Sequence, residues 1–509
     1  MADSSRSTGS VLLSSGVLVF VGMLLEMATN FSSKIIVAKL LTPAQYGAIA
    51  LGFTTLSFLV MFVMLGVDRG VARYLPRAET DSGKRAVVLV AFKTTLPLSI
   101  LAGASLVVLA PFLAVDVFSD PSTEFVFRLV GIALPFSALI RVAIGTGQGL
   151  QTPFPKVLLQ NFARPVTRLA AVLLVAAVGV SVAGVASAYL ASFVITGLIA
   201  SYYLVVRLPF SLRGGSRSRT RELLRFSFPL MIASTMAVQL GTIDTLVLGI
   251  KSDTASVGVY NVVFPLAQLL TLFNASFGFL VMPVISKFHS QNDDDSMRDV
   301  YQTVTKWVFI MTLPIFLMML LFPETIIRRT FGAQYTGGAL TLMILTAGFF
   351  VQGVTGPNGD TLTSIGNSKL IMILNGGVAI LNIALNVVLV PRFGAVGAAI
   401  ATATVYSLLN ILFSVFLYRN AKILPDFAAL VPPAVLGAVT VVGVYAIDRI
   451  FALEFFAAAV VMTVFLGAYG VVILRYSVGK MEKGVIDDIG RERGIDVAAV
   501  QQFIQYFQS

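Results

Sequence analysis

The chain contains about fourteen runs of roughly 18 or more predominantly apolar residues, and these runs limit what it can fold into. A run of this length crosses the hydrocarbon core of a bilayer as a helix, whereas a strand of a membrane barrel needs only ~10 residues of alternating polarity. We therefore expect an all-α polytopic membrane protein with about 14 transmembrane helices. The expected spans are 13–34, 46–66, 86–113, 125–144, 157–178, 182–205, 226–249, 257–285, 304–323, 338–356, 370–390, 394–417, 427–447 and 452–475.

The amino-acid composition agrees with a membrane protein. The chain is 57% hydrophobic and 12% charged, with a mean hydropathy of +0.89, and a soluble protein would carry about twice that charge. The absence of cysteine excludes disulfides and thiolate metal sites, and the single histidine excludes a cluster of imidazole ligands. The N-terminal MADSSRSTGS has no cleavage signal, so we expect a retained cytoplasmic tail.

Lysine and arginine set the expected orientation, because cytoplasmic loops carry an excess of both. Most of the 36 basic residues fall in loops or at helix ends that are cytoplasmic if the N-terminus is cytoplasmic. With an even number of helices, we expect both termini in the cytoplasm. The net charge of +11 then favours anionic membrane lipids over nucleic acid as partners, at about 1 kcal/mol per basic residue near the surface.

Two pairs of similar segments indicate an internal duplication. AKLLTPAQYGAIAL (38–51) matches GIKSDTASVGVYNV (249–262), and GVSVAGVASA (179–188) matches RFGAVGAAIATA (392–403), at nearly the same offset. We predict two pseudo-symmetric six-helix lobes of parallel orientation, with two further helices, as in transporters that work by alternating access. The predicted parts are an N-lobe at 1–206, a basic linker at 207–225, a C-lobe at 226–420, two helices at 421–476 and a cytoplasmic amphipathic tail at 477–509.

The order of four motifs resembles that of a known family. LTPAQYG, QNFARPVTRL, GTIDTLVLG and GAVGAAIATA are similar to segments of the polysaccharide transporters in the multidrug/oligosaccharidyl-lipid/polysaccharide (MOP) flippase superfamily. The resemblance implies two lobes around a V-shaped central cavity. It also implies a non-enzymatic flippase, in the plasma membrane of a prokaryote, that moves a lipid-linked oligosaccharide from the cytoplasmic to the outer leaflet. Glycosyltransferases or a polymerase of the same pathway are then the expected protein partners.

A basic site is predicted in QNFARPVTRL (160–169). Arg164 and Arg168 are four residues apart, so they share one helix face. Arg168 falls near the middle of the bilayer, where a guanidinium group costs at least about 2.5 kcal/mol. The substrate that the resemblance implies carries a phosphate or diphosphate, whose geometry the guanidinium fork matches. We expect Lys93 and Arg128 to line the same cavity.

Two alternative roles for the arginines stay open. Arg164 is near enough to the inner interface for its side chain to reach the headgroups. Alternatively, the arginines pair with Glu26, the one acidic residue embedded in the predicted N-lobe. Glu26 is also a candidate carrier of a coupling proton.

A second site is predicted for a coupling cation. Asn382 and Asn386 share a face of the eleventh predicted helix, Thr402 lies on the twelfth, and Asp244 lies on the seventh. Carboxylate, amide and hydroxyl oxygens are suitable ligands for Na⁺. Some superfamily members resemble this arrangement, although Asn386 stands where a second carboxylate is expected. The alternative is that the asparagines only bond neighbouring helices.

Two further functions compete with the flippase. A cation-coupled multidrug exporter of the same superfamily is one, and a membrane glycan polymerase or ligase is the other. The polymerase would need acids or histidines in a large outer loop, and the expected outer loops are short. The acidic run NDDDS (292–296) resembles the metal-binding DxD of glycosyltransferases, but a solvated charge run is the better interpretation.

Overall fold

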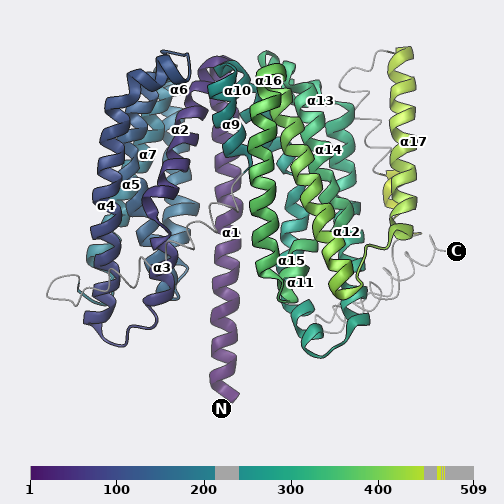
Figure 1. The fold of residues 1–509 in the computed structure, drawn as a ribbon, viewed down its shortest axis with the longest axis horizontal. Helices are drawn as coiled ribbons and strands as arrows, with labels where there is room; N and C mark the ends of the chain where they lie inside the picture. Colours follow the sequence, from purple (N-terminus) through teal and green to yellow (C-terminus); the bar gives the residue numbers. More distant parts are fainter. Residues whose placement is uncertain (1, 212–239, 452–466, 472, 474, 476–509) are drawn as a thin grey trace. The chain divides into compact units, whose positions relative to one another are not determined.

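The computed structural model describes residues 2–211, 240–451, 467–471, 473 and 475. Most of the predicted linker, the first part of the seventh predicted helix, most of the last one and the predicted tail at 477–509 therefore lie outside the described residues. Within the described ranges, all regular secondary structure is helical (Figure 1).

The first part of the chain forms seven α-helices. They are α1 (Ala2–Leu40), α2 (Pro43–Met64), α3 (Val67–Tyr74), α4 (Asp81–Phe112), α5 (Thr123–Gly149), α6 (Arg164–Val178) and α7 (Val182–Tyr202). Three π-helical segments adjoin them, namely η1 (Leu113–Val117), η2 (Lys156–Ala163) and η3 (Tyr203–Arg207). Helix α5 packs against α2, α3, α4 and α7, and α6 packs against α1 and α7.

The second part continues with α9 and further helices. These are α9 (Leu240–Lys251), α10 (Thr254–Gln268), α11 (Thr271–Ser290), α12 (Asp294–Leu321), α13 (Pro323–Thr330), the 3₁₀ segment η4 (Ala333–Gly338), α14 (Ala339–Thr355), α15 (Asn358–Ser364), α16 (Ser368–Ala421) and α17 (Phe427–Phe451). Helix α12 packs against α11, α14 and α17.

The chain divides into two compact units, which we describe separately. The first comprises residues 1–262, 330–335 and 383–398, and the second comprises 263–329, 336–382 and 399–509. The second unit has a core in which Phe309, Leu313 and Leu317 of α12 contact Leu430 of α17. The division into lobes at 206 and 226 stays a prediction.

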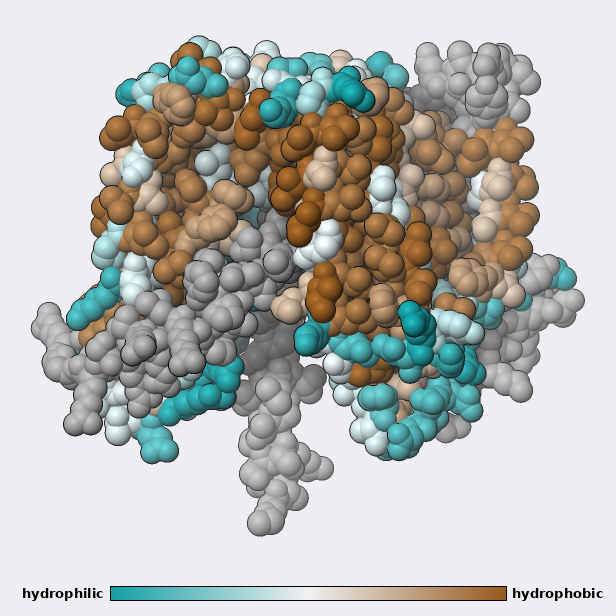
Figure 2. All heavy atoms as spheres, in the orientation of Figure 1, coloured by the Kyte–Doolittle hydropathy of each residue, from teal (hydrophilic) through white to brown (hydrophobic). Residues whose placement is uncertain are grey.

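The described helices have the dimensions and surfaces of membrane spans. Ten of them are long and apolar enough to cross a bilayer. Hydrophobic residues cover the flanks of the helices, and hydrophilic residues gather at their ends (Figure 2). Large apolar side chains such as Val108, Val178 and Phe279 are more than three-quarters exposed, which a soluble surface rarely tolerates in such number. The protein is therefore a multi-pass membrane protein.

One of these helices contains two of the predicted spans. Helix α16 has 54 residues, so it would extend about 80 Å if straight, over twice the thickness of a bilayer core. The backbone is not helical at Gly394 (φ 52°, ψ −130°), a conformation that glycine adopts readily. This break separates the predicted spans 370–390 and 394–417.

The predicted single span 257–285 is wrong in one respect, because the structure divides it into α10 and α11. Pro265 has no N–H and cannot donate a helical hydrogen bond. After it, Leu269 and Leu270 bond to the carbonyl groups of Leu266 and Ala267, three residues earlier, at 3.1 and 3.2 Å. The helix therefore tightens and ends between residues 268 and 271.

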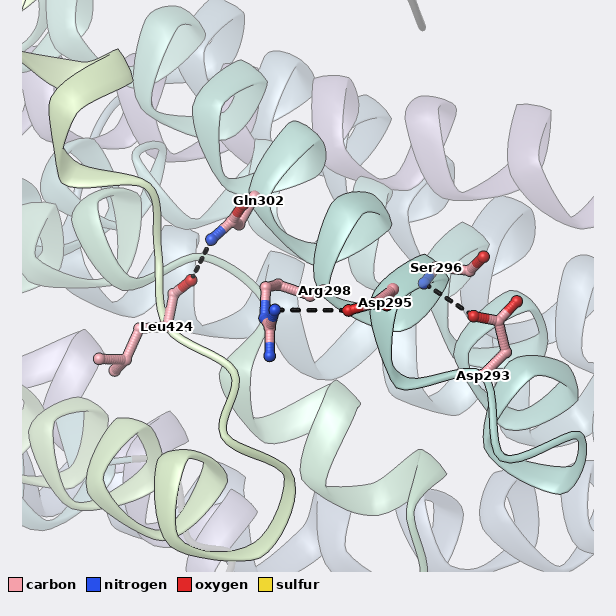
Figure 3. Close-up of polar contacts among 6 residues, drawn as sticks. All are labelled: Asp293, Asp295, Ser296, Arg298, Gln302 and Leu424. Carbon is pink, nitrogen blue, oxygen red and sulfur yellow. Dashed lines mark hydrogen bonds and ion pairs between the residues drawn. The ribbon is translucent and has the colours of Figure 1, made fainter.

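The acidic run at 292–296 has a structural role at the start of α12 (Figure 3). Asp293 accepts a 3.0 Å hydrogen bond from the backbone N–H of Ser296, as a helix N-cap does. These hydrogen bonds to Ser296 lower the pKa of the Asp293 carboxyl. Asp295 pairs with Arg298 at 3.5 Å, and Gln302 donates to the carbonyl of Leu424 at 3.1 Å.

The duplicated segments meet in the first unit through two equivalent glycines. A Cβ added to Gly47 of α2 would overlap the carbonyl oxygen of Thr254, and one added to Gly258 of α10 would overlap that of Pro43. Gly258 follows Gly47 by the same 211 residues by which Thr254 follows Pro43. The two helix starts therefore cross with pseudo-two-fold symmetry, and glycine at both positions permits the backbone contact.

We expect Gly47→Ala and Gly258→Ala each to destabilise the protein by about 1–3 kcal/mol, because a methyl group must displace backbone. Gly377→Ala is the matched control, since a Cβ on this glycine of α16 meets nothing within 4 Å. Thermal unfolding in detergent measures the effect. Equal melting temperatures for all three variants would show that the helices do not cross at these glycines.

The orientation is testable with accessible tags. Ser119 follows η1 and is exposed, and we expect a tag after it to react with an impermeant reagent from outside. A tag after Ser216, outside the described residues, should react only from the cytoplasm. The opposite result at either position would contradict the orientation or the number of helices.

Candidate functional site

Two polar helix faces pack against each other in the first unit. On α1, Glu26, Asn30 and Lys34 follow each other at intervals of four residues, which places them along one face. Arg164 and Arg168 have the same spacing on α6, which packs on α1. All five residues are partly buried. Asn30 and Lys34 were not among the residues predicted for the site, although their spacing from Glu26 is visible in the sequence.

Arg168 is held from two sides. Its Nη2 donates to the side-chain oxygen of Asn30, and its guanidinium lies 5.1 Å from the ring centre of Tyr189 on α7. The buried Nε of Arg168 has no partner among the described residues. An aromatic face stabilises a desolvated cation by about 2 kcal/mol, so α1 and α7 fix the guanidinium while its Nε stays without a partner among the described residues.

Arg164 has a different environment. Its guanidinium lies 5.3 Å from the ring centre of Phe193, one turn beyond Tyr189 on α7. The carboxylate of Glu26 acts on this guanidinium. It interacts with Arg164 more strongly than with Arg168 and forms a hydrogen bond with the side chain of Gln160. No ion pair within 4.0 Å joins Glu26 to either arginine in the part of the chain that the structure describes.

The π-helical segment η2 precedes these arginines for a local reason. Pro165 has no N–H, so the α-helical bond to the carbonyl of Asn161 cannot form. The preceding eight residues, Lys156–Ala163, take the wider π-helical turn, which is rare and often found at functional sites. The regular α-helix resumes at Arg164, so Arg164 and Arg168 keep their i, i+4 relation.

Two further residues predicted for this site, Lys93 and Arg128, lie on α4 and α5. Lys93 is exposed on α4, which packs mainly on α5. Arg128 pairs with Glu124 at 2.5 Å in the first turns of α5. That these two residues line a cavity with the arginines therefore stays a prediction.

Asp244 on α9 belongs to a second polar group in the first unit. Its side chain is fully buried. Asn386 of α16 donates its amide to Asp244 Oδ1 at 2.8 Å, and the Tyr260 hydroxyl of α10 donates to Oδ2. The next residues of the two helices also bond, since Asn261 of α10 donates to the hydroxyl of Thr245 of α9 at 3.0 Å. Tyr260 was not predicted from the sequence, although it is the only tyrosine in α10.

Asn382 and Thr402 belong to the second unit. Both side chains are fully buried, and the Asn382 amide donates to the Thr402 hydroxyl at 3.3 Å. Within the described residues, no group of three or more His, Cys, Asp or Glu is placed to hold a metal ion. A cation at Asp244 would accordingly be held by one carboxylate and neutral oxygens, which suits a monovalent ion better than a divalent one.

We expect Asp244→Asn to weaken Na⁺ binding at least tenfold, because the change removes the one negative charge of this polar group. Isothermal calorimetry with NaCl, against choline chloride as the reference salt, measures the affinity. Asp294→Asn, at an exposed carboxylate in the first turn of α12, is the control and should bind Na⁺ as the wild type does. If Asp244→Asn bound Na⁺ as tightly as Asp294→Asn does, Asp244 would have only a packing role.

A family model described as "Polysaccharide biosynthesis protein" matches residues 36–339, which contain both arginines and Asp244. Two archaeal relatives are similar over much of the chain. An uncharacterized membrane protein of Methanocaldococcus jannaschii is 27% identical and aligns over 69% of this chain and 73% of its own length. A probable low-salt glycan biosynthesis flippase of Haloferax volcanii is 25% identical over 51% of this chain and 57% of its own length.

Solved structures share the fold at low sequence identity. The lipid II flippase MurJ, in an inward closed conformation, is 16% identical, with a TM-score of 0.68 over 91% of this chain and 99% of its own. An inward-facing multidrug transporter of the MATE family and MOP superfamily is 17% identical, with a TM-score of 0.65 over 80% of this chain and 98% of its own. The match to the family model over more than half of the chain shows that this protein belongs to the polysaccharide biosynthesis protein family, and the solved structures show that it shares their fold.

Proposed function

We propose that the protein moves a lipid-linked oligosaccharide, joined through a phosphate or diphosphate to a polyprenyl chain, from the cytoplasmic to the outer leaflet. The observation that carries the proposal is the alignment of Arg164 and Arg168 of α6 against the polar face of α1, at membrane depth. Each cation costs about 2.5–3.5 kcal/mol there. An anionic substrate would return this cost, because charge-assisted bonds to phosphate strengthen in a low dielectric.

Charge also separates this proposal from the multidrug exporter. The site has two arginines and a lysine but only one carboxylate, Glu26, so it carries excess positive charge. Such a site repels a cationic drug and attracts a phosphate. The flippase named among the relatives and the one among the solved structures support the same choice.

The proposal also covers the location of the protein, its pathway partners and its coupling ion. The protein would lie in the plasma membrane of a prokaryote with both termini in the cytoplasm, and it would catalyse no covalent step. Glycosyltransferases of the pathway would supply its substrate at the cytoplasmic face. Asp244, Asn386, Asn382 and Thr402 would bind a coupling Na⁺, with a proton on Glu26 as the alternative.

Arg168→Ala should abolish flipping with little loss of folded protein. Asn30 and Tyr189 return only part of the insertion cost of its guanidinium, and the substrate returns the rest. Arg168→Lys should restore part of the activity, because it keeps the charge but loses the bidentate fork. Arg164→Ala should be milder, because the adjacent Glu26 already balances part of that charge. The measurements are glycolipid accumulation in the inner leaflet of cells and the melting temperature of the purified protein.

A purely structural pair between Arg168 and Glu26 predicts a different pattern. Each single alanine variant would then be unstable, and the Arg168→Ala/Glu26→Ala double variant would recover, since no unpaired charge remains. If transport returned in this double variant, the phosphate-binding role of Arg168 would be wrong.

A further inference from the structure

Lys34 of α1 is a third cation beside the two arginines. It lies one helical turn after Asn30, which binds Arg168, and its side chain is partly buried. Its ammonium group makes no hydrogen bond and no ion pair with the rest of the described chain. Lys34 and Arg168 lie close enough for their charges to repel each other. Two like charges held together at membrane depth are unfavourable unless an anion lies between them.

The acids near the site do not supply that anion. Glu26 lies two turns before Lys34 on α1, a separation of about 12 Å along the helix, and it interacts first with Arg164, then with Lys156 and last with Arg168. Asp68 of α3 pairs with Arg141 at 3.8 Å. Glu26 thus acts mainly on Arg164, Asp68 pairs with Arg141, and neither Lys34 nor Arg168 has a carboxylate within 4.0 Å among the described residues.

We infer that Lys34 and Arg168 together bind the phosphate of the substrate, while Arg164 with Glu26 only positions the cluster. This inference rests on the proposed function and assigns its anion to a particular pair of side chains. The unpartnered Nε of Arg168 supplies one donor, and the Lys34 ammonium has all three of its donors available. Asn30 and Tyr189 hold the guanidinium in place for this contact.

The proposal is tested by comparing Lys34→Gln with Lys39→Gln in the full-length purified protein. Lys39 is exposed at the end of the same helix and serves as the matched control. Lys34→Gln should weaken binding of a short polyprenyl diphosphate about tenfold, because a charged hydrogen bond is lost. Without ligand it should also raise the melting temperature, because the repulsion with Arg168 disappears. Lys39→Gln should change neither quantity.

Two measurements distinguish the possible failures. If Lys34→Gln binds the diphosphate as the wild type does, or melts at a lower temperature without ligand, Lys34 is a structural residue and the inference is wrong. If Arg168→Ala retains the wild-type affinity as well, the cluster binds no phosphate and the proposed function itself fails. Loss of binding in Arg168→Ala alone would leave the proposed function intact and reject only the role of Lys34.

Discussion

The energetic cost of cationic side chains at membrane depth governs the arrangement of the first unit. Arg164 and Arg168 lie on a mainly apolar helix, and lipid offers no partner for a guanidinium. The neighbouring helices therefore provide the partners. Helix α7 contributes two aromatic faces, from Tyr189 and Phe193, and α1 contributes an amide, from Asn30. The position of α6 between α1 and α7 follows from this requirement, because the arginines are stabilised by groups from both of these helices.

Much of the fold follows from patterns in the sequence, and the exceptions have local causes. The apolar runs predict most of the described spans, because length and hydropathy alone decide which segments cross a bilayer. They do not predict the end of α10, since a proline in a membrane run causes a kink in one context and a helix end in another. The π-helical turn before Arg164 is similar, because Pro165 is visible in the sequence whereas the adjustment of the preceding eight residues depends on packing.

The sequence predicted only some of the site residues. Residues close together on one helix were predictable, whereas contacts between helices distant in the chain were not. The i, i+4 spacing identified Arg164 with Arg168, because residues on one helix have fixed relations. It equally offered Glu26, Asn30 and Lys34, but nothing in a single sequence states which face of α1 meets α6. Arg128 forms a pair of the local kind, with Glu124 one turn away on the same helix. Tyr260 was missed because its partner, Asp244, lies on another helix.

The duplication predicted from the sequence relates the two candidate sites to each other. Gly47 and Gly258 correspond at an offset of 211 residues, and at the same offset Ser33 and Lys34 of α1 correspond to Asp244 and Thr245 of α9. The first copy thus carries a cation at the depth where the second carries an acid. The Asp244 carboxylate accepts hydrogen bonds from Asn386 and Tyr260 and so needs no substrate to stabilise it, whereas a lysine beside Arg168 has no such partner in the described part of the chain. If the two segments are copies of one helix hairpin, the first copy would bind the anionic substrate and the second would bind the coupling cation. The two copies would then differ in side chains and not in fold.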